Sequence, residues 1–412
     1  MNVLVCRWDR VTLEAVLDRG ARVTLVFDEW EAANRGVDQK LLDRVDNYYV
    51  IRSFDALDEL AQLAVDIRST GVKIDRLLSL SEFSQFGAAY LAQLLGLALP
   101  AVETSVLMRD KRAMKDRARQ AGIPCARFVS MSTRDIEGAV RRAEQELGFP
   151  VVVKPAAGLG SVDTSKVEDA EQLTAVLQEA GSGAGVRFLM AEEVVNGDEF
   201  HVDAVWADGK AKVFGVSRYL RPRMAVTTPG HDNGSILLPR EHEAALYEEM
   251  ENLHERINLA FDITDEITHL EVFRRADGEL WFSEIATRFA GAAVPESFGP
   301  RAADLRELWI ETVLGEGREL PAKTSPYPYV GWINLAPAEA GRILEEPSDE
   351  SISRFPYVLK TFRSRPAGSE IEELHPSVWC LLLVIGADSE AQFRERAAEL
   401  EAALLPAYVM GK

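Results

Sequence analysis

The chain has 412 residues, a length that suggests two or three domains, and a formal charge of −20 at pH 7. This acidic balance argues against general nucleic-acid binding, which requires a basic face, and against adhesion to anionic membranes. Three cysteines far apart in the sequence argue against a disulfide framework and fit the reducing cytoplasm. The apolar start at residues 2–6 meets charged residues at once, which is typical of a buried strand rather than of a secretion signal.

The first hundred residues alternate short apolar strands with helical stretches. Strands are predicted at residues 3–5, 23–27 and 76–80, and a helix at residues 11–17 that ends near Gly20. This alternation is typical of a parallel α/β sheet. No G-x-G-x-x-G fingerprint of dinucleotide binding follows the first strand. The segment is therefore interpreted as a nucleotide-type fold that has lost its nucleotide, or as a domain that binds something else.

The next segment carries the densest positive charge of this acidic chain. Residues 109–127 hold seven Lys or Arg against two Asp, and Pro124 ends a helix there. A second helix is predicted over residues 136–147, with Thr133 as its N-cap and Gly148 as its stop.

From about residue 187 the pattern changes to β-hairpins. Two-residue turn signals between β-type runs stand at Asn196-Gly197, Asp208-Gly209 and Asp277-Gly278. Beyond them the sequence predicts a helix over residues 241–259, a proline-rich joint over 321–328 and a closing amphipathic helix over 389–405.

Two glutamates are placed by the turn at Asp277-Gly278. If this turn has two residues, Glu271 lies directly opposite Glu284 on one face, with Cβ atoms about 4.5–5.5 Å apart. Two such carboxylates repel unless a cation lies between them, and Mg²⁺ suits them because it takes its other ligands from water and phosphates. His269 falls on the same face. An exposed face with two solvated glutamates is the alternative, and a bulge would break the register.

Two lysines are candidates to hold the phosphates that Mg²⁺ bridges. Lys154 ends the apolar strand 151–154 in front of a glycine-rich loop, where backbone N–H groups can approach an anion. Lys111 lies in the basic stretch. The alternatives are a flexible loop and a solvated helix face. The glycine-rich loop contains Gly158, Gly160 and Ser161.

Four further polar residues are candidates for ligand contacts. Glu199, just after Asn196-Gly197, could accept the hydroxyls of a ribose, and Arg288 could clamp a carboxylate or an acyl phosphate with two hydrogen bonds. His231 in a polar loop and Glu82 after a predicted strand could meet a substrate. Each has a purely structural alternative: a hairpin acid, a surface ion pair, an exposed loop residue or a helix start.

Taken in order, six segments resemble the ATP-grasp superfamily, and in particular its carboxylate–amine ligases, among them the L-amino acid ligases. The resemblance covers about residues 109–295, and the flanks carry no diagnostic motif. One departure is Ala286, where the family often has Asn two residues after its second metal-binding Glu. The segments are Arg109-Asp110-Lys111 with Met114, Gly122-Ile123-Pro124, Phe149 to Pro155 with Gly158 to Ser161, Glu192 to Phe200, His269 to Val272, and Ser283 to Arg288.

The resemblance implies an α/β (α+β) architecture and a role for each matched position. The implied ATP-grasp fold has an N-terminal parallel α/β domain (1–107), an ATP-grasp domain (108–315) whose lid covers about residues 124–196, and a C-terminal mixed α/β domain (316–412). Arg288 would be catalytic and stabilise the acyl phosphate, and Glu271 and Glu284 would bind Mg²⁺ or Mn²⁺. ATP would be contacted by Lys111, Lys154, Gly158, Gly160, Ser161, Glu192, Val195 and Glu199.

The expected activity is that of an ATP-dependent ligase. It would join a small, amino-acid-like carboxylate to an amine through an acyl phosphate, with ADP and phosphate released, in the cytoplasm and without nucleic-acid or membrane partners. The alternatives are an enzyme that activates bicarbonate or formate, and a non-catalytic nucleotide-binding module, for which Ala286 is the only sign. Homodimerisation is common in the family, and the sequence gives no sign of it.

Overall fold

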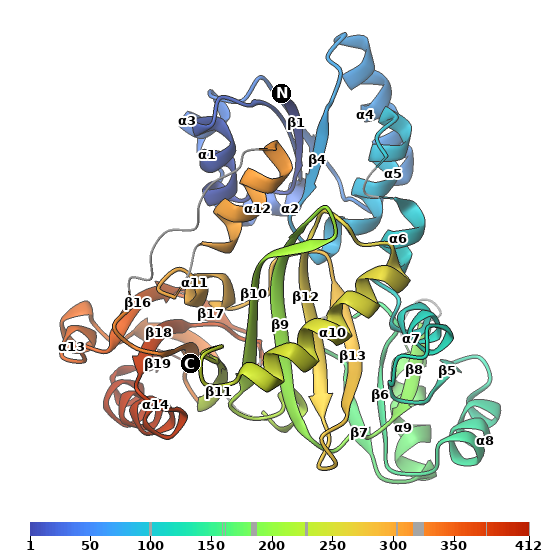
Figure 1. Ribbon diagram of the computed structural model, residues 1–412, viewed down its shortest axis with the longest axis vertical. Coiled ribbons are helices and arrows are strands. Elements are labelled where there is room, and N and C mark those ends of the chain that lie inside the picture. The colour runs from blue at the N-terminus through green and yellow to red at the C-terminus, as the bar shows by residue number, and fades with distance from the viewer. Residues whose placement is uncertain are drawn as a thin grey trace.

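The fold is seen in a computed structural model (Figure 1), in which the strands of the described residues form four sheets. In the part of the chain that the structure describes, no helix has both the length and the apolar character needed to cross a membrane. The described residues are 1–98, 101–158, 160, 162–182, 188–226, 230–301, 304–315, 325–375 and 377–411.

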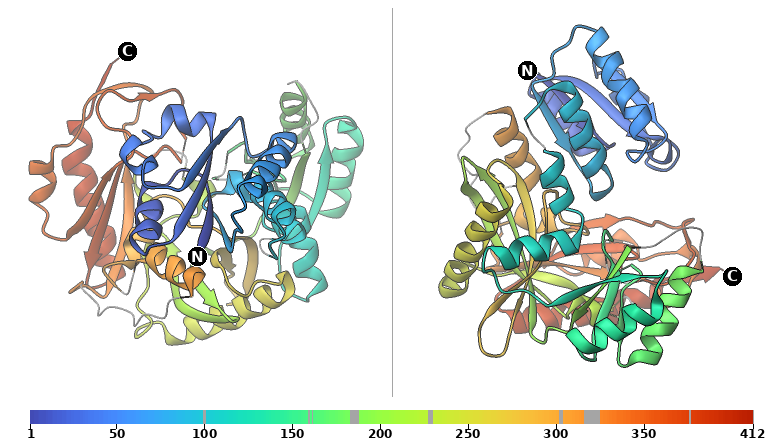
Figure 2. Two further views of the ribbon diagram at one scale, coloured as in Figure 1. Left: turned by 90° about the horizontal axis from the view of Figure 1, so that it is seen from above. Right: turned by 90° about the vertical axis from the view of Figure 1, so that its right-hand side faces the viewer.

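The N-terminal region is a four-stranded parallel sheet in the order β3-β2-β1-β4, which Figure 2 shows as a layer set apart from the rest. Helices cover both of its faces, so the inner strands are continuous apolar runs, as at residues 3–6. The three predicted strands and the first helix are confirmed. The elements are β1 (Asn2–Cys6), α1 (Arg10–Asp18), β2 (Arg22–Asp28), α2 (Glu29–Asn34), α3 (Gln39–Leu42), β3 (Asn47–Ile51), α4 (Leu57–Ser69), β4 (Arg76–Ser79), α5 (Gln85–Leu95) and α6 (Val102–Leu107).

A second, antiparallel sheet in the order β5-β8-β6-β7 packs against two helices, α8 and α9, at the lower right of Figure 1; we call it the lid sheet. The predicted N-cap of α8 is wrong: Asp135, not Thr133, accepts the hydrogen bond from the Gly138 N–H, because it stands immediately before the helix. The elements from α7 onward are α7 (Lys111–Gln120), β5 (Phe128–Ser132), α8 (Ile136–Glu146), β6 (Val151–Pro155), β7 (Ser165–Val167), α9 (Ala170–Gly181) and β8 (Phe188–Glu193).

The largest sheet has eight antiparallel strands in the order β13-β12-β9-β10-β11-β14-β18-β16. Strands from before and after residue 315 belong to this one sheet. The strands β17, β15 and β19 form a separate, three-stranded sheet. The elements from β9 onward are β9 (Asp198–Ala207), β10 (Lys210–Tyr219), β11 (Gly230–Leu237), α10 (Ala244–Phe261), β12 (Ile267–Arg274), β13 (Leu280–Ala286), α11 (Val294–Phe298), α12 (Leu305–Leu314), β14 (Tyr329–Leu335), β15 (Gly341–Glu345), α13 (Asp349–Ser353), β16 (Val358–Arg363), β17 (Glu370–Ile371), β18 (Leu381–Ala387), α14 (Glu390–Leu404) and β19 (Val409–Gly411).

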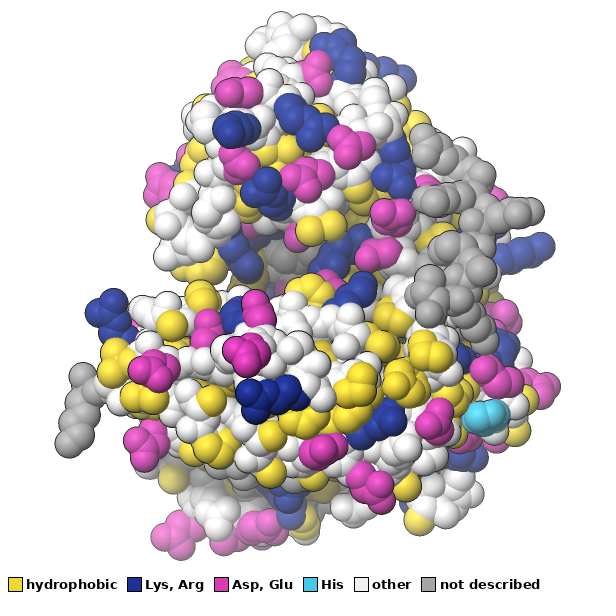
Figure 3. All heavy atoms as spheres, turned by 90° about the vertical axis from the view of Figure 1, so that its left-hand side faces the viewer, with side chains coloured by type: hydrophobic (Ala, Val, Ile, Leu, Met, Phe, Trp, Pro, Cys, Tyr) yellow, Lys and Arg dark blue, Asp and Glu magenta, His cyan; other side chains and the backbone are white. Residues whose placement is uncertain are grey.

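The two faces of the large sheet have different partners. One face packs against α10 and α14 in the largest apolar cluster. The other packs against α11, α12 and side chains of the N-terminal region. Figure 3 shows the surface narrowing to a waist between the N-terminal region and the rest of the molecule. We therefore expect a ligand-binding cavity where the N-terminal region meets the large sheet.

The three predicted turns have three different outcomes. Asp208-Gly209 joins β9 to β10 as predicted, with both residues at positive φ. Asn196-Gly197 does not form a hairpin: β8 belongs to the lid sheet and β9 to the large sheet, so this segment carries the chain from one sheet to the other. The turn at Asp277-Gly278 joins β12 to β13, with a register described below.

Candidate active site

The hairpin β12–β13 pairs Glu271 with Glu284, as predicted, but its loop length and its register near the turn differ from the prediction. Near the turn Val272 pairs with Phe282, one residue away from the predicted register, so the loop is longer than the two residues expected. Ser283 is then left without a partner on β12, and this bulge restores the predicted register beyond it. The two departures cancel, and the two carboxylates face one another.

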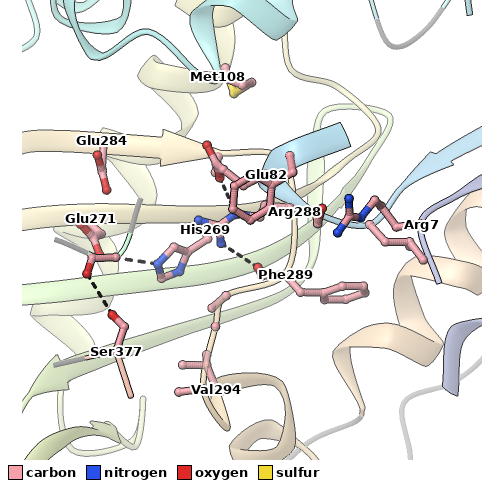
Figure 4. Close-up of a pocket in the computed structure, with 18 of the residues that line it drawn as sticks. Arg7, Glu82, Met108, His269, Glu271, Glu284, Arg288, Phe289, Val294 and Ser377 are labelled. Atoms are coloured by element: carbon pink, nitrogen blue, oxygen red, sulfur yellow. Dashed lines mark hydrogen bonds and ion pairs between the residues drawn. The ribbon is translucent and has the colours of Figure 1, made fainter. Parts of the chain in front are cut away.

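Two adjoining cavities meet at this hairpin. The larger, of about 500 Å³, extends to the loops that follow β1, β2 and β4, at the carboxyl ends of the parallel strands where ligands usually bind in such sheets (Figure 4). The smaller, of about 110 Å³, lies between the lid sheet and the hairpin. Both cavities are lined by Lys111, Gly158, Gly160, Arg223, Glu271 and Glu284.

The facing carboxylates suit a divalent cation. The Tyr219 hydroxyl donates to Glu271 Oε1 at 3.0 Å, and His269 Nε2 lies 3.6 Å from the same oxygen. Burial alone would raise the pKa of Glu271, but the neighbouring imidazole of His269 holds it below its usual range. Glu284 Oε2 is buried, and its ion-pair partner among the described residues is Lys111, whose Nζ lies 2.9 Å away. Paired carboxylate oxygens with spare acceptor capacity fit Mg²⁺.

A buried chain of hydrogen bonds stands behind Glu271. Asp203 Oδ1 lies 2.9 Å from His269 Nδ1, Asp203 Oδ2 lies 2.6 Å from His201 Nδ1, and His201 Nε2 lies 2.8 Å from Ser235 Oγ. Burial would lower the pKa of His269, but Asp203 raises it to about 9. Sequence reasoning missed His201 and Asp203, whose signal was the alternation of polar residues along β9 from Glu199.

On the lid side a third glutamate is held by two lysines. Glu192 Oε1 lies 2.5 Å from Lys154 Nζ, and Glu192 Oε2 lies 3.0 Å from Lys115 Nζ. Burial opposes ionisation of Glu192, but the two ammonium groups lower its pKa to about 2. Sequence reasoning missed Lys115, which it counted only as part of the basic stretch. The signal was its position one helical turn after Lys111, on the same face of α7.

The other predicted nucleotide contacts are arranged around the smaller cavity or near it. Glu199 lines this cavity, and its carboxylate accepts the Arg223 N–H at 2.6 Å. Burial and the nearby Glu271 raise the pKa of Glu199 to about 8. Val195 is half-buried in the segment between β8 and β9, and Ser161 lies outside the described residues.

Arg288 and Glu82 come together in the larger cavity. Arg288 Nε lies 2.5 Å from Glu82 Oε2, and an Arg109 amino group lies 2.5 Å from Glu82 Oε1. The two guanidinium groups together lower the pKa of Glu82 although burial acts to raise it. Figure 4 shows Arg288 between the facing carboxylates and the N-terminal strands. His231 lies on β11, and its side chain is outside the described part of the structure.

Comparison with known proteins gives matches in sequence and in structure. Residues 118–291 match the family model described as D-ala D-ala ligase C-terminus. An L-arginine-specific L-amino acid ligase of Bacillus subtilis is 30% identical over 254 residues, which is 60% of this chain and 59% of the relative. A D-alanine–D-alanine ligase of Xylella fastidiosa is 36% identical over 98 residues, 24% of this chain and 32% of the relative. The chain thus spans about three fifths of the first relative and a third of the second.

Solved structures match over the whole chain. The crystal structure of an L-amino acid ligase from Bacillus licheniformis has a TM-score of 0.80 at 17% identity, with 100% of this chain and 99% of the other covered. The biotin carboxylase domain of a Hydrogenobacter thermophilus 2-oxoglutarate carboxylase, solved with MgADP and bicarbonate, has a TM-score of 0.67 at 19% identity, with 100% and 90% covered.

The whole-chain likeness to these solved structures confirms the predicted α/β (α+β) fold class, and residues 118–291 are similar to the D-ala D-ala ligase C-terminal family. Its sequence matches include an L-amino acid ligase and D-alanine–D-alanine ligases, together with a carbamoyl phosphate synthase large chain of Thermotoga neapolitana.

Proposed function

We propose that the protein is an ATP-dependent carboxylate–amine ligase that joins two amino-acid-like molecules by an amide bond. The observation that carries the proposal is the meeting of two cavities at one pair of facing carboxylates, Glu271 and Glu284. A phosphoryl group can be transferred only where its donor and acceptor lie side by side, and charge on that group is best stabilised at the place where they meet. The L-amino acid ligase and the D-alanine–D-alanine ligase among the sequence relatives support the same activity.

The smaller cavity is the proposed nucleotide site, with its reactive end toward the hairpin. Lys111 and Lys154 would contact the phosphates of ATP, and Gly158, Gly160 and Ser161 would close over them. Glu192 and the Val195 backbone would read adenine, and Glu199 the ribose. In the present arrangement the Glu192 carboxylate is occupied by two lysines, so any adenine contact has to share it. Glu271 and Glu284 would hold Mg²⁺ or Mn²⁺, which neutralises phosphate charge when bound.

The larger cavity is the proposed site of chemistry. An oxygen of the substrate carboxylate attacks the γ-phosphorus, the bond from that phosphorus to the bridging oxygen breaks, and ADP leaves. The amine of the second substrate then attacks the acyl carbon, a proton is lost from nitrogen, and phosphate leaves. Arg288, which lines this cavity, would donate to the oxygens of the acyl phosphate, and its planar guanidinium suits two such bonds. Enclosure by the N-terminal region would keep water from the intermediate.

The substrates are proposed to be amino acids, bound beyond Arg288 toward the N-terminal strands. That part of the cavity is lined by aromatic side chains as well as charged ones, among them Trp8, Phe83 and Phe289. Glu82 and His231 are the proposed substrate contacts. Glu82 already binds Arg109 and Arg288, so an approaching amine would have to replace one of these two partners. The three cysteines are buried and free, which fits a protein of the reducing cytoplasm.

The test is a screen for release of ADP and phosphate with the purified protein, Mg²⁺ and ATP. Amino acids are supplied singly and in pairs, and bicarbonate and formate serve as separate arms. Turnover that requires an amino acid and yields an amide by mass spectrometry supports the proposal. Turnover with bicarbonate or formate alone would assign the chain to the other activity, and nucleotide binding without turnover across the whole panel would point to a non-catalytic module.

A further inference from the structure

One buried lysine lines neither cavity among the described residues, yet it contacts both the lid sheet and the hairpin β12–β13, between which the proposed nucleotide site lies. Lys115 is 1% exposed and lines neither cavity among the described residues. Its ammonium group lies 3.0 Å from Glu192 Oε2 on the lid sheet and donates to the Ser283 carbonyl oxygen on β13 at 3.2 Å. A fully buried lysine is costly unless its charge is balanced, so its retention here needs a reason.

Lys115 contacts Ser283, the residue whose bulge determines how Glu271 and Glu284 are paired. Ser283 is the bulge residue, and it is the bulge that brings Glu284 opposite Glu271. A bulge residue is not held by the strand ladder, so it needs another partner. Lys115 supplies that partner from α7 and thereby fixes the backbone immediately before Glu284.

The contact with Glu192 falls on the residue that holds Lys154. Glu192 divides its two oxygens between Lys115 and Lys154, which are 1% and 12% exposed. Without Lys115, the Glu192 carboxylate is free to turn toward Lys154 alone. Lys111, one turn earlier on the same helix, meanwhile contacts Glu284 Oε2 and the Gly158 carbonyl oxygen. One face of α7 therefore ties the lid sheet and its loop to the metal hairpin.

We propose that Lys115 is a positioning residue that joins Glu192 to the bulge at Ser283 and so sets the spacing of the Glu271–Glu284 pair. This proposal rests on the proposed function, because it assigns Lys115 to the binding of a divalent cation with a nucleotide. It does not require the ligase reaction itself. Groups that orient metal ligands from behind commonly change metal affinity about 10- to 100-fold when they are removed.

The test is calorimetric titration of the 412-residue chain with ADP over a series of Mg²⁺ concentrations. Lys115→Met, which keeps the length of the side chain without its charge, is expected to raise the Mg²⁺ concentration for half-maximal nucleotide binding by about tenfold or more. Arg119→Met is the matched control, because it removes an exposed charge from the last turn of the same helix. The control should leave the Mg²⁺ requirement unchanged. A Lys115→Met protein that unfolds cooperatively and keeps the wild-type Mg²⁺ requirement overturns the proposal.

A second variant keeps the test decisive if Lys115→Met does not fold. Lys115→Gln keeps a hydrogen-bond donor group without the charge and is expected to raise the Mg²⁺ requirement by a smaller factor than Lys115→Met does. An unchanged requirement in this variant also overturns the proposal. The readout is separate from that of the proposed function: a wild-type protein that binds ADP with Mg²⁺ but releases no phosphate would refute the ligase assignment and leave the role of Lys115 intact.

Discussion

The two sides of the smaller cavity shift the pKa values of their glutamates in opposite directions. We call the side formed by the lid sheet the lid wall, and the side formed by the large sheet with its hairpin β12–β13 the hairpin wall. On the lid sheet, Glu192 has two lysine ammonium groups within 3.0 Å, and its pKa is lowered to about 2. On the large sheet, Glu199 has the backbone N–H of Arg223 and the nearby carboxylate of Glu271, and its pKa is raised to about 8. Both side chains are buried, so burial does not explain the difference. Two ammonium groups balance the charge of Glu192 on the lid wall, whereas on the hairpin wall Glu199 lies beside a second carboxylate, which favours its neutral form and would favour a bound cation.

The largest effect is expected on the hairpin wall. Glu284→Gln removes one of the two facing carboxylates while nearly preserving shape, and should lower kcat/KM by about 1,000-fold, near the upper end for loss of one electrostatic contact to a transition state. Steady-state assays of ADP release at several Mg²⁺ concentrations measure it.

The matched control for this variant lies on the same hairpin. Glu279 is exposed beside the turn, where Arg275 lies near it, and Glu279→Gln should leave activity within about twofold. Wild-type activity in Glu284→Gln would mean that the carboxylate of Glu284 has no part in the reaction.

On the lid wall the first consequence of losing a carboxylate should be lower stability. Glu192→Gln leaves Lys115 and Lys154 buried without their shared counter-ion, and breaking a buried pair in this way costs about 3–5 kcal/mol. Urea unfolding followed by fluorescence gives the free energy of unfolding. Glu193→Gln is the control on the same strand: its partner Arg127 is 59% exposed, so the cost should be below about 1 kcal/mol. Equal effects of the two variants would contradict the contrast between the walls.

Part of the candidate site could be predicted from the sequence, and the reasons differ from residue to residue. The facing pair was found because a turn signal and a period of two place side chains without tertiary information. The predicted pairing of Glu271 with Glu284 is correct only because the longer loop shifts the register by one residue and the bulge at Ser283 shifts it back. No local sequence pattern indicates either shift. Lys115 and Asp203 were missed because their partners lie far away in the sequence, on β8, β13 and β12. The false hairpin at Asn196-Gly197 has the same cause: turn residues specify a bend, whereas the sheet that the next strand joins depends on the whole fold.

A divalent cation should stabilise the hairpin wall and do little for the lid wall. With ADP present, Mg²⁺ at about 100 times its dissociation constant should add about 2.7 kcal/mol to the free energy of unfolding. The gain should disappear in Glu271→Gln, which lacks one ligand, and in wild type when EDTA is added. Urea midpoints measured with and without Mg²⁺ give the comparison. A gain that persists in Glu271→Gln would move the cation site away from the hairpin.

The smallest effect concerns a buried group that belongs to neither wall. His254 is fully buried on α10, its Nε2 lies 3.1 Å from Thr268 Oγ1, and burial lowers its pKa to about 3, against a weaker opposite influence of Asp203. In the unfolded chain its pKa is near 6.5, so as pH falls below that value the unfolded state takes up a proton that the folded state refuses. Its contribution to stability is therefore complete above about pH 6.5 and declines toward pH 3, by at most about 1.4 kcal/mol per pH unit.

Urea unfolding at pH 7, 6 and 5 isolates this contribution when wild type is compared with His254→Gln, which keeps a donor for Thr268 but has no proton to gain. The wild type should lose more stability over this range than the variant, whereas His242→Gln, at an exposed position, should follow the wild type. Parallel curves for wild type and His254→Gln would mean that burial alone shifts a pKa less in this protein than supposed. The raised pKa of Glu199 would then have to come mainly from Glu271, and the contrast between the two walls would become one of neighbouring charges only.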